Sequence, residues 1–521
     1  MGFPGFFAYL LNKLKPNIKK IIYTHHSLDQ CYLFIDANSV FHDVCNEVRA
    51  SYINQNTVDM EKNMCKSIII KLNKIISEVN PAKTYICVDG VPPMGKIIQQ
   101  RKRRYMGAKK LVENNTDFAN DWYNIKITPH TAFMNMIDKY LKKKYSSRDD
   151  VVVSDSSVRG EGEFKMFDQI INDDITNVVI YGLDTDLILL SMIQNKNIYL
   201  MREYDDRFKE HIHIDNEYVY ISIDQLKKYF VQFMINNTDQ NINCMQKSVY
   251  KQRLINDVVL LCMLFGNDFV MCLPSLSIYS HNLDQIINIY MTGLHEYDYL
   301  ITDNDTRVDI HNDFFKYIIN ALSNDEENML DNRLNKFNNT NSITNITDLN
   351  KYITSEQVNI DIKNIKLSKF RYYDIYFNST EYQKNAIDNA CVKYLNSVYW
   401  TINYYFHKNV SNNYYYPFNA PPFVSDIQTY MNAYKYNINN SELFDTHQHI
   451  SDIEHLLIVI PPQCKCLLPD EYKHMLNSDS QISYMCPCDF MIDISYKKVE
   501  HQYIPILPPI DINYIKRVLQ I

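Results

Sequence analysis

The chain has 521 residues, of which 46% are hydrophobic and 22% are charged, and its formal net charge is -8. These values are typical of a globular protein with a large core, divided into about three domains of ~150 residues each. No apolar run reaches the roughly 18 residues that a membrane-spanning helix needs, which excludes a transmembrane helix. The negative charge also disfavours a protein that coats nucleic acid without specificity.

The N-terminal residues, MGFPGFFAYLLNKLK, have neither a basic region before the apolar stretch nor a small-residue cleavage site, so they do not form a secretory signal. The 12 cysteines are then most simply reduced thiols. We therefore expect a cytoplasmic protein. The heavy use of Asn, Ile, Lys and Tyr suggests an AT-rich genome, such as that of a virus or a parasite.

Short apolar runs rich in β-branched and aromatic residues predict the strands of a parallel α/β sheet, at residues 31–37, 84–89, 151–154 and 178–184. Most of these runs end in an acid and are followed by helix-like segments. In such sheets ligands bind outside the carboxyl ends of the strands, which is where the acids fall. Residues 258–265 favour a buried helix over a strand.

Seven carboxylates stand out, five of them at or just beyond the ends of predicted apolar elements and two alternating with glycine in RGEGE: Asp36, Asp89, Glu161, Glu163, Asp184, Asp186 and Asp268. If they gather at one site, their charges repel unless divalent cations neutralise them. A set of ligands made only of oxygen atoms favours Mg²⁺ or Mn²⁺. The chemistry that two such ions would support is a displacement reaction at phosphorus. A single acid is more often a cap or a solvated group, but the conjunction is specific.

The run KIIQQRKRRYMGAKK, at residues 96–110, holds seven cations and no acid. On a helix its residues Lys96, Gln100, Arg103 and Arg104 share one face. Arginine forks suit the several oxygens of a terminal phosphate. A solvated helix face or a nuclear localisation signal is the common explanation of such a run in isolation, but its nearness to Asp89 favours a phosphate site.

Glycine is scarce, and most of the ten glycines lie beside these charged clusters: Gly90, Gly95, Gly107, Gly160, Gly162, Gly182 and Gly266. Glycine permits a close approach of the backbone, so we expect loops that hold a ligand near the main chain, with ordinary turns as the alternative.

These segments resemble the XRN family of 5′-to-3′ exoribonucleases in MGFPGFFAYL, LFIDANSVFH, VDGVPPMGKIIQQRKRRY, VRGEGEFK, YGLDTDLILL and LFGNDFVMCLP. The resemblance implies a PIN-like, flap-nuclease-like parallel-sheet core. It also implies that the seven acids hold two Mg²⁺ ions, for which Mn²⁺ can substitute, and that the face of Lys96, Gln100, Arg103 and Arg104 binds a 5′-monophosphate. His42 would stack on the bases.

The resemblance continues in RYYDIYF, YLNSVYWTINYYF, YYYPFNAPP and LLIVIPPQCKCLLP, which implies a minimal catalytic core. We expect a nuclease region at residues 1–318, an Asn-rich linker or insertion at 319–350, and a second conserved region at 351–521 that walls the active site. Three residues depart from the family pattern. His130 stands where the family has glycine, and Asn412 and Tyr414 replace tryptophans, one of which would stack on bases with His42; Tyr414 can still stack.

Other aromatic and cysteine clusters have simpler explanations. We expect Trp400 and the tyrosines of residues 394–405 to lie in the core. Two C-x-C pairs, which together could form a zinc site of uncommon spacing, are Cys464, Cys466, Cys486 and Cys488.

The sequence thus predicts a metal-dependent 5′-to-3′ exoribonuclease that degrades single-stranded RNA with a 5′-monophosphate to mononucleotides. We expect the protein to be a monomer without a membrane partner, and a decapping activity to supply the 5′-monophosphate ends. One alternative is a structure-specific DNA nuclease of the flap class, which does not account for the QQRKRRY helix. Another is a catalytically silent scaffold that binds RNA 5′ ends, which would gain nothing from so many acids.

Overall fold

A computed structural model of the chain describes residues 3, 5–51, 57–173, 175–209, 212–213, 215–236, 248–338, 352–353, 365–377, 384–444, 449–494, 497 and 502–520. No helix in these ranges is long and apolar enough to cross a membrane. The chain forms two compact units, each assembled from distant segments. Unit 1 comprises Met1–Asn17, Lys227–Gln448 and Phe490–Ile506, and unit 2 comprises Ile18–Leu226, His449–Asp489 and Leu507–Ile521.

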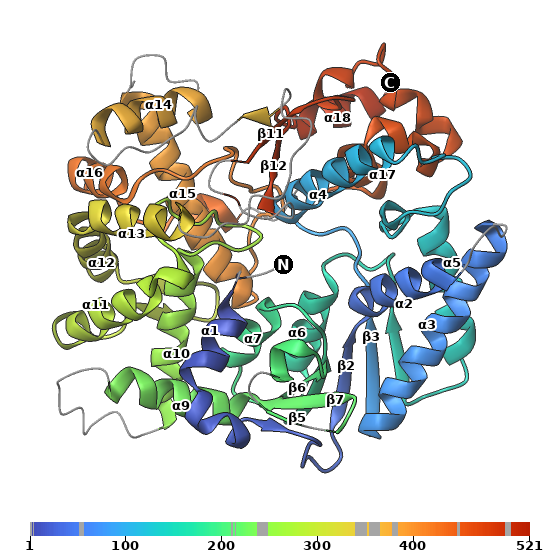
Figure 1. Ribbon diagram of the computed structural model, residues 1–521, viewed down its shortest axis with the longest axis horizontal. Coiled ribbons are helices and arrows are strands. Elements are labelled where there is room, and N and C mark those ends of the chain that lie inside the picture. Colours follow the sequence, from blue (N-terminus) through green and yellow to red (C-terminus); the bar gives the residue numbers. More distant parts are fainter. Residues whose placement is uncertain are drawn as a thin grey trace. The chain divides into compact units, whose positions relative to one another are not determined.

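Unit 2 is built on a seven-stranded sheet of order β1-β7-β6-β5-β2-β3-β4 (Figure 1). Its five parallel strands are β2 (Tyr32–Asp36), β3 (Lys83–Cys87), β4 (Val151–Ser154), β5 (Asn177–Tyr181) and β6 (Asn197–Glu203). The antiparallel strands are β7 (Tyr218–Ser222) and β1 (Ile22–Tyr23). The predicted parallel α/β sheet is confirmed, and its four predicted strands correspond to β2 to β5. Strands β6, β7 and β1 lie outside the predicted runs.

The strands at the centre of the sheet are apolar because side chains cover both of their faces. Leu33 and Ile35 of β2 share a core with α2 (Ala37–Ser51) and α3 (Thr57–Val79). Phe34 points to the opposite face, because side chains alternate along a strand, and its ring stacks on that of Tyr85 at 4.7 Å.

The order of the strands places a binding site at one edge of the sheet. From β2 the chain moves outward through β3 and β4, then returns to the other side of β2 and continues through β5 and β6. The connections therefore diverge at the carboxyl ends of β2 and β5, which is where ligands bind in open α/β sheets.

The remaining helices of unit 2 are α4 (Met94–Glu113), α5 (Ala132–Tyr145), α6 (Gly162–Asn172), α7 (Asp186–Met192), α8 (Asp206–Lys209), α17 (Asp452–Val459) and α18 (Ile512–Leu519). Helix α4 contains the predicted cationic run, and α17 packs against it. Arg101 of α4 is buried and donates to the backbone carbonyls of Pro508, at 2.8 Å, and Met485. Residues far along the chain therefore complete the unit that contains the sheet.

Unit 1 is mainly helical. Its helices are α1 (Phe6–Lys13), α10 (Ser248–Met263), α11 (Asn282–Tyr297), α12 (Asn312–Asn324), α13 (Glu326–Asn338), α14 (Ile365–Phe377), α15 (Lys384–Tyr405) and α16 (Val424–Tyr434), while α9 (Ile223–Asn236) begins in unit 2. Its short strands are β8 (Ile301–Asp303), β9 (Val308–Ile310), β10 (Tyr352–Ile353), β11 (Met491–Asp493) and β12 (Ile504–Ile506).

Three predictions fall in unit 1. The buried helix expected at residues 258–265 is confirmed as far as Met263, where α10 ends. Trp400, which is 1% exposed, lies in the core as predicted, and so do Tyr394, Tyr399 and Tyr405 of α15, whereas Tyr404 is only partly buried. Part of the Asn-rich segment is helical, because α13 covers it as far as Asn338, and residues 339–350 lie outside the described residues.

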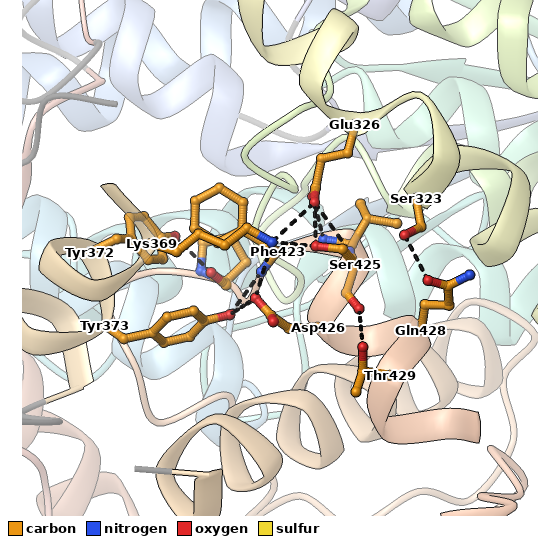
Figure 2. Close-up of polar contacts among 12 residues, drawn as sticks. Ser323, Glu326, Lys369, Tyr372, Tyr373, Phe423, Ser425, Asp426, Gln428 and Thr429 are labelled. Carbon is orange, nitrogen blue, oxygen red and sulfur yellow. Dashed lines mark hydrogen bonds and ion pairs between the residues drawn. The ribbon is translucent and has the colours of Figure 1, made fainter. Parts of the chain in front are cut away.

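A buried network joins α13, α14 and α16 (Figure 2). Glu326 accepts the backbone N–H of Val424 at 2.7 Å and so caps α16, while Lys369 lies 3.4 Å from Glu326 and 3.5 Å from Asp426. The Tyr373 hydroxyl donates to Asp426 at 2.9 Å. The two acids thus share the partly buried ammonium of Lys369.

This network predicts a large difference between neighbouring glutamates. We expect Glu326→Ala to lower the free energy of unfolding by about 3 kcal/mol, because it removes a cap and leaves Lys369 with one acid. Glu327→Ala, at an exposed position on the same helix turn, is the control and should change it by less than about 0.5 kcal/mol. Urea denaturation measures both, and equal losses would contradict the assignment.

Candidate active site

Six of the seven predicted acids lie in unit 2, after parallel strands. Asp36 is the last residue of β2, and Asp89 follows β3. The backbone N–H of Asp89 donates to the Asn38 side chain at 3.0 Å, and the N–H of Gly162 donates to Asp89 Oδ1 at 2.7 Å. The start of α6 is therefore held against the ends of two central strands.

Gly162 has no room for a side chain. An added Cβ would lie 2.9 Å from the carbonyl oxygen of Cys87, 3.3 Å from Asp89 Oδ1 and 3.5 Å from Asp36 Oδ1. The main chain of residue 162 therefore lies close to these acids, an approach that glycine permits, and the ligand expected beside this glycine stays a prediction.

We expect Gly162→Ala to lower the free energy of unfolding by about 2 kcal/mol, because the first turn of α6 must move away from β3. Gly107→Ala is the matched control, because a Cβ there meets only the Ile125 side chain, at 3.9 Å. It removes a glycine from the interior of α4 and should stabilise the protein by about 0.5 to 1 kcal/mol. Chemical denaturation of the two variants would contradict this account if their effects had the same sign.

Glu161 and Glu163 flank Gly162, and both are buried. Lys96 of α4 places its ammonium 2.5 Å from Glu161 Oε2 and 3.9 Å from Glu163 Oε1. This lysine, predicted in the phosphate site, therefore contacts the acids directly and joins the cationic helix to the acidic cluster.

The acids interact strongly with one another. Burial raises the pKa of Asp36, and the charges of Asp89 and Asp184 raise it further. Burial likewise raises the pKa of Glu163, to which Glu161 and other acids add while Lys96 opposes them. Among the residues that the structure describes, no three His, Cys, Asp or Glu side chains are arranged to hold a metal ion as they stand. The repulsion and the oxygen-only donor set nevertheless fit hard divalent cations.

Asp184 and Asp186 follow β5, and Asp186 begins α7 with its side chain buried. The backbone carbonyl of Asp184 accepts a 2.7 Å hydrogen bond from Arg202 of β6, which is 1% exposed. Lys165 of α6 similarly donates to the carbonyl of Val88, at 2.7 Å, beside Asp89. Neither cation was among the site residues predicted from the sequence. Arg202 could have been found from the sequence, because it is a charged residue at the end of the apolar run NIYLM, where a buried charge needs a partner.

Asp268 belongs to unit 1, where it lies in the loop after α10. Gly266 adopts a φ of 89°, and Asn267 Oδ1 accepts the backbone N–H groups of Phe269 and Val270 at 2.9 and 2.8 Å. These hydrogen bonds hold the loop that contains Asp268. Asp268 belongs to unit 1, whereas the other six acids belong to unit 2.

The cationic face of α4 lies near His42 of α2. Burial and then the charge of Arg103 lower the pKa of Arg104 to about 9, and Arg104 Nε donates to Thr128 Oγ1 at 2.7 Å. Burial, followed by Arg103 and Arg104, lowers the pKa of His42 to about 4. The guanidinium groups of Arg103 and Arg104 and the uncharged imidazole of His42 therefore lie close together. An anion bound beside them would relieve the repulsion between the two arginines.

The low pKa of His42 predicts a pH dependence of stability. The imidazole of His42 has a pKa of 6.5 in the unfolded chain and about 4 in the folded chain. Between these two values the unfolded chain binds a proton that the folded chain does not, so the free energy of unfolding falls as the pH drops from 6.5 to 4. Because part of the ring is exposed, we expect a loss of roughly 1 to 2 kcal/mol between pH 7 and pH 5. His42→Phe should abolish this component in urea titrations at the two pH values, and identical losses in both proteins would contradict it.

Tyr414 lies in unit 1 and is fixed by its hydroxyl, which donates to the carbonyl of Lys393 at 2.7 Å and lies 3.0 Å from the Ser397 hydroxyl. Its ring stacks on that of Trp400, with centroids 6.1 Å apart. The predicted base-stacking residue is thus a rigid aromatic group anchored on α15.

Among the described residues, the four cysteines of the C-x-C pairs do not form a group that could hold a metal ion. Cys464 and Cys486 are buried, and the Cys466 thiol donates to the carbonyl of Phe118 at 3.0 Å. Their environments are those of ordinary thiols.

Comparison with protein families gives two matches that together cover most of the chain. Residues 1–204 match the family model described as the XRN 5′-3′ exonuclease N-terminus, and residues 249–366 and 368–520 match that of the Xrn1 helical domain. The chain belongs to the XRN family. The predicted family resemblance is therefore confirmed. His130 adopts a φ of 70°, a left-handed conformation that favours glycine, which explains why glycine is the XRN residue expected there.

The XRN relatives are much longer than this chain. Human 5′-3′ exoribonuclease 1 is 24% identical over 98% of this chain and 33% of its own length, and the Drosophila melanogaster 5′-3′ exoribonuclease 2 homolog is 23% identical over 92% and 64%. Among solved structures, the T5 D15 protein co-crystallized with metal ions has 12% identity over 58% of this chain and 86% of that chain. Its TM-score of 0.28 is too low to support a conclusion.

Proposed function

We propose that this chain is a 5′-to-3′ exoribonuclease that hydrolyses single-stranded RNA with a 5′-monophosphate and releases mononucleotides stepwise. The contact of Lys96 with Glu161 carries the proposal, because it joins a cationic helix face to a cluster of acids. Family membership and relatives named as 5′-3′ exoribonucleases support the same reaction.

The cationic face would bind the terminal phosphate of the RNA. Lys96, Gln100, Arg103 and Arg104 supply donors, and guanidinium forks suit a phosphate with several free oxygens. His42 is uncharged at neutral pH because its pKa is about 4, so it can stack on a base without adding to the local positive charge. Tyr414 would provide a second stacking surface, and such contacts contribute about 1 to 3 kcal/mol per base.

The acids would hold two Mg²⁺ ions, with Mn²⁺ as a substitute, and the proposed ligands are Asp36, Asp89, Glu161, Glu163, Asp184, Asp186 and Asp268. Bound Mg²⁺ would supply Lewis-acid activation of water and neutralise charge at phosphorus. The chain contributes the positions of these ligands. Gly162 lets α6 approach Asp89, and Arg202 and Lys165 hold the loops of Asp184 and Asp89 through backbone carbonyls.

In this proposal residues 1–318 form the nuclease region, residues 319–350 an insertion, and residues 351–521 a second region that encloses the substrate. We further propose that the protein acts as a monomer in the cytoplasm, on RNA ends produced by a decapping activity.

Substrate competition tests the proposed reaction. The protein is incubated with labelled 5′-phosphorylated single-stranded RNA and Mg²⁺, in the presence of excess unlabelled RNA of the same kind or excess 5′-flap DNA. We expect labelled mononucleotides as products, inhibition by the RNA competitor and little inhibition by the DNA. Cleavage of the flap DNA with intact RNA would replace the proposal with a structure-specific DNA nuclease.

A further inference from the structure

A buried histidine in unit 2 contacts the predicted phosphate face. His455 of α17 is fully buried, and its Nε2 lies 3.0 Å from the side-chain oxygen of Gln100 on α4, which is 6% exposed. The two residues are 355 positions apart in the sequence. A polar pair sealed between two packed helices is costly unless its hydrogen bond is made, so its geometry is strongly determined.

The direction of this hydrogen bond follows from the charges around it. Burial lowers the pKa of His455 far below its usual range, and the positive charge of Arg104 lowers it further, as does His130. The ring is therefore neutral and has a single N–H. Its other nitrogen, Nδ1, is buried without a hydrogen-bond partner among the described residues. An unpaired buried N–H is rarer than an unpaired acceptor, so the proton belongs on Nε2.

This protonation state fixes the orientation of the Gln100 amide. If Nε2 of His455 donates, the atom of Gln100 that faces it is the oxygen, and the NH₂ group of Gln100 points away from the ring. That NH₂ group makes no hydrogen bond to any residue that the structure describes. The side of the amide that is turned away from His455 thus offers only donors, which suits an anion.

We propose that His455 is a positioning residue of the 5′-phosphate site, which holds the amide of Gln100 so that its two N–H groups face the terminal phosphate. This inference rests on the proposed function, since it assigns Gln100 to the same site. Without His455 the amide could rotate, and its carbonyl oxygen would then repel the phosphate. Residue 455 would therefore govern the preference for a phosphorylated end rather than the affinity for RNA in general.

Two amide substitutions of His455 separate this role from a structural one. In His455→Gln the amide nitrogen can occupy the place of Nε2 and donate to Gln100. In His455→Asn the amide reaches only the place of Nδ1. The measurement is the ratio of dissociation constants for fluorescent oligouridylate with a 5′-hydroxyl and with a 5′-monophosphate, in EDTA so that no hydrolysis occurs, together with the thermal midpoint of each variant.

We expect His455→Gln to keep the ratio of the natural protein within about twofold, and His455→Asn to reduce it by about tenfold, the effect of about one hydrogen bond to a charged group. Affinity for the 5′-hydroxyl RNA should stay the same. In the Gln100→Leu background, His455→Asn should have no further effect, because residues that act through one contact are not additive. An unchanged ratio in His455→Asn, or additive losses in the double variant, would overturn the inference.

The proposed function and this inference fail in different ways. If the natural protein does not prefer the phosphorylated RNA, the phosphate site itself is wrong and the role of His455 falls with it. If the natural protein has the preference but His455→Asn keeps it, only the inference is wrong. Should His455→Asn not fold, ¹⁵N NMR of the natural protein with labelled histidine gives the tautomer directly, and a proton on Nδ1 would refute the assignment.

Discussion

Asp186→Asn is expected to reduce hydrolysis of 5′-phosphorylated RNA by about a thousandfold or more, while RNA binding stays within about threefold of that of the natural protein. Asp186 is buried at the start of α7, beside the other acids. The amide keeps the shape of the side chain but removes a negative charge that would hold Mg²⁺, and loss of several kcal/mol of charge stabilisation corresponds to this factor. Single-turnover cleavage and binding in EDTA measure the two effects.

Asp149→Asn is the control for this change. It removes the same charge at an exposed turn between α5 and β4, and it should leave cleavage unchanged. Comparable loss of activity in both variants would mean that overall charge, and not the acidic cluster, determines the rate.

Arg103→Ala is expected to reduce the preference for a 5′-monophosphate over a 5′-hydroxyl end by about 10- to 100-fold, through the Michaelis constant and not the maximal rate. Arg103 is exposed on α4, beside the more buried Arg104. A charge-assisted hydrogen bond to phosphate contributes roughly 1.5 to 3 kcal/mol, which corresponds to this range.

Lys143→Ala removes an equal charge from the exposed face of α5 and serves as the control for Arg103→Ala. It should weaken RNA binding slightly and equally for both kinds of end, and only at low salt. If Arg103→Ala left the ratio of phosphate to hydroxyl substrates unchanged, the cationic face of α4 would not be the phosphate site.

The sequence predicted those parts of the fold that depend on local patterns. The apolar runs around Phe34 and Ile86 indicated buried parallel strands, and the spacing of Lys96, Gln100 and Arg103 placed them on one helix face. Both predictions depend only on the spacing of residues along a single strand or helix. The position of the acids at one edge of the sheet could be predicted from these strands, because parallel strands bring their carboxyl ends to the same edge.

Features that depend on contacts between distant residues could not be predicted from those patterns. Helix α13 occupies a segment whose composition favours a loop, and it forms because Met329 and Leu330 are buried and Arg333 donates to the carbonyl of Pro274 at 2.6 Å. Tertiary packing here overrides local preference. The pairing of His455 with Gln100 joins residues from opposite ends of the chain, and no local signal relates them.

The central claim is that the acidic cluster and the cationic face of α4 serve one reaction at a 5′-phosphorylated RNA end. A timed digestion of 3′-fluorescent single-stranded RNA, with a 5′-monophosphate or a 5′-hydroxyl and with Mg²⁺ or EDTA, tests it most directly. We predict mononucleotide release from the phosphorylated RNA, much slower release from the hydroxyl RNA, and none with EDTA or with Asp186→Asn. Equal digestion of both ends, or digestion that persists in EDTA, would contradict the claim.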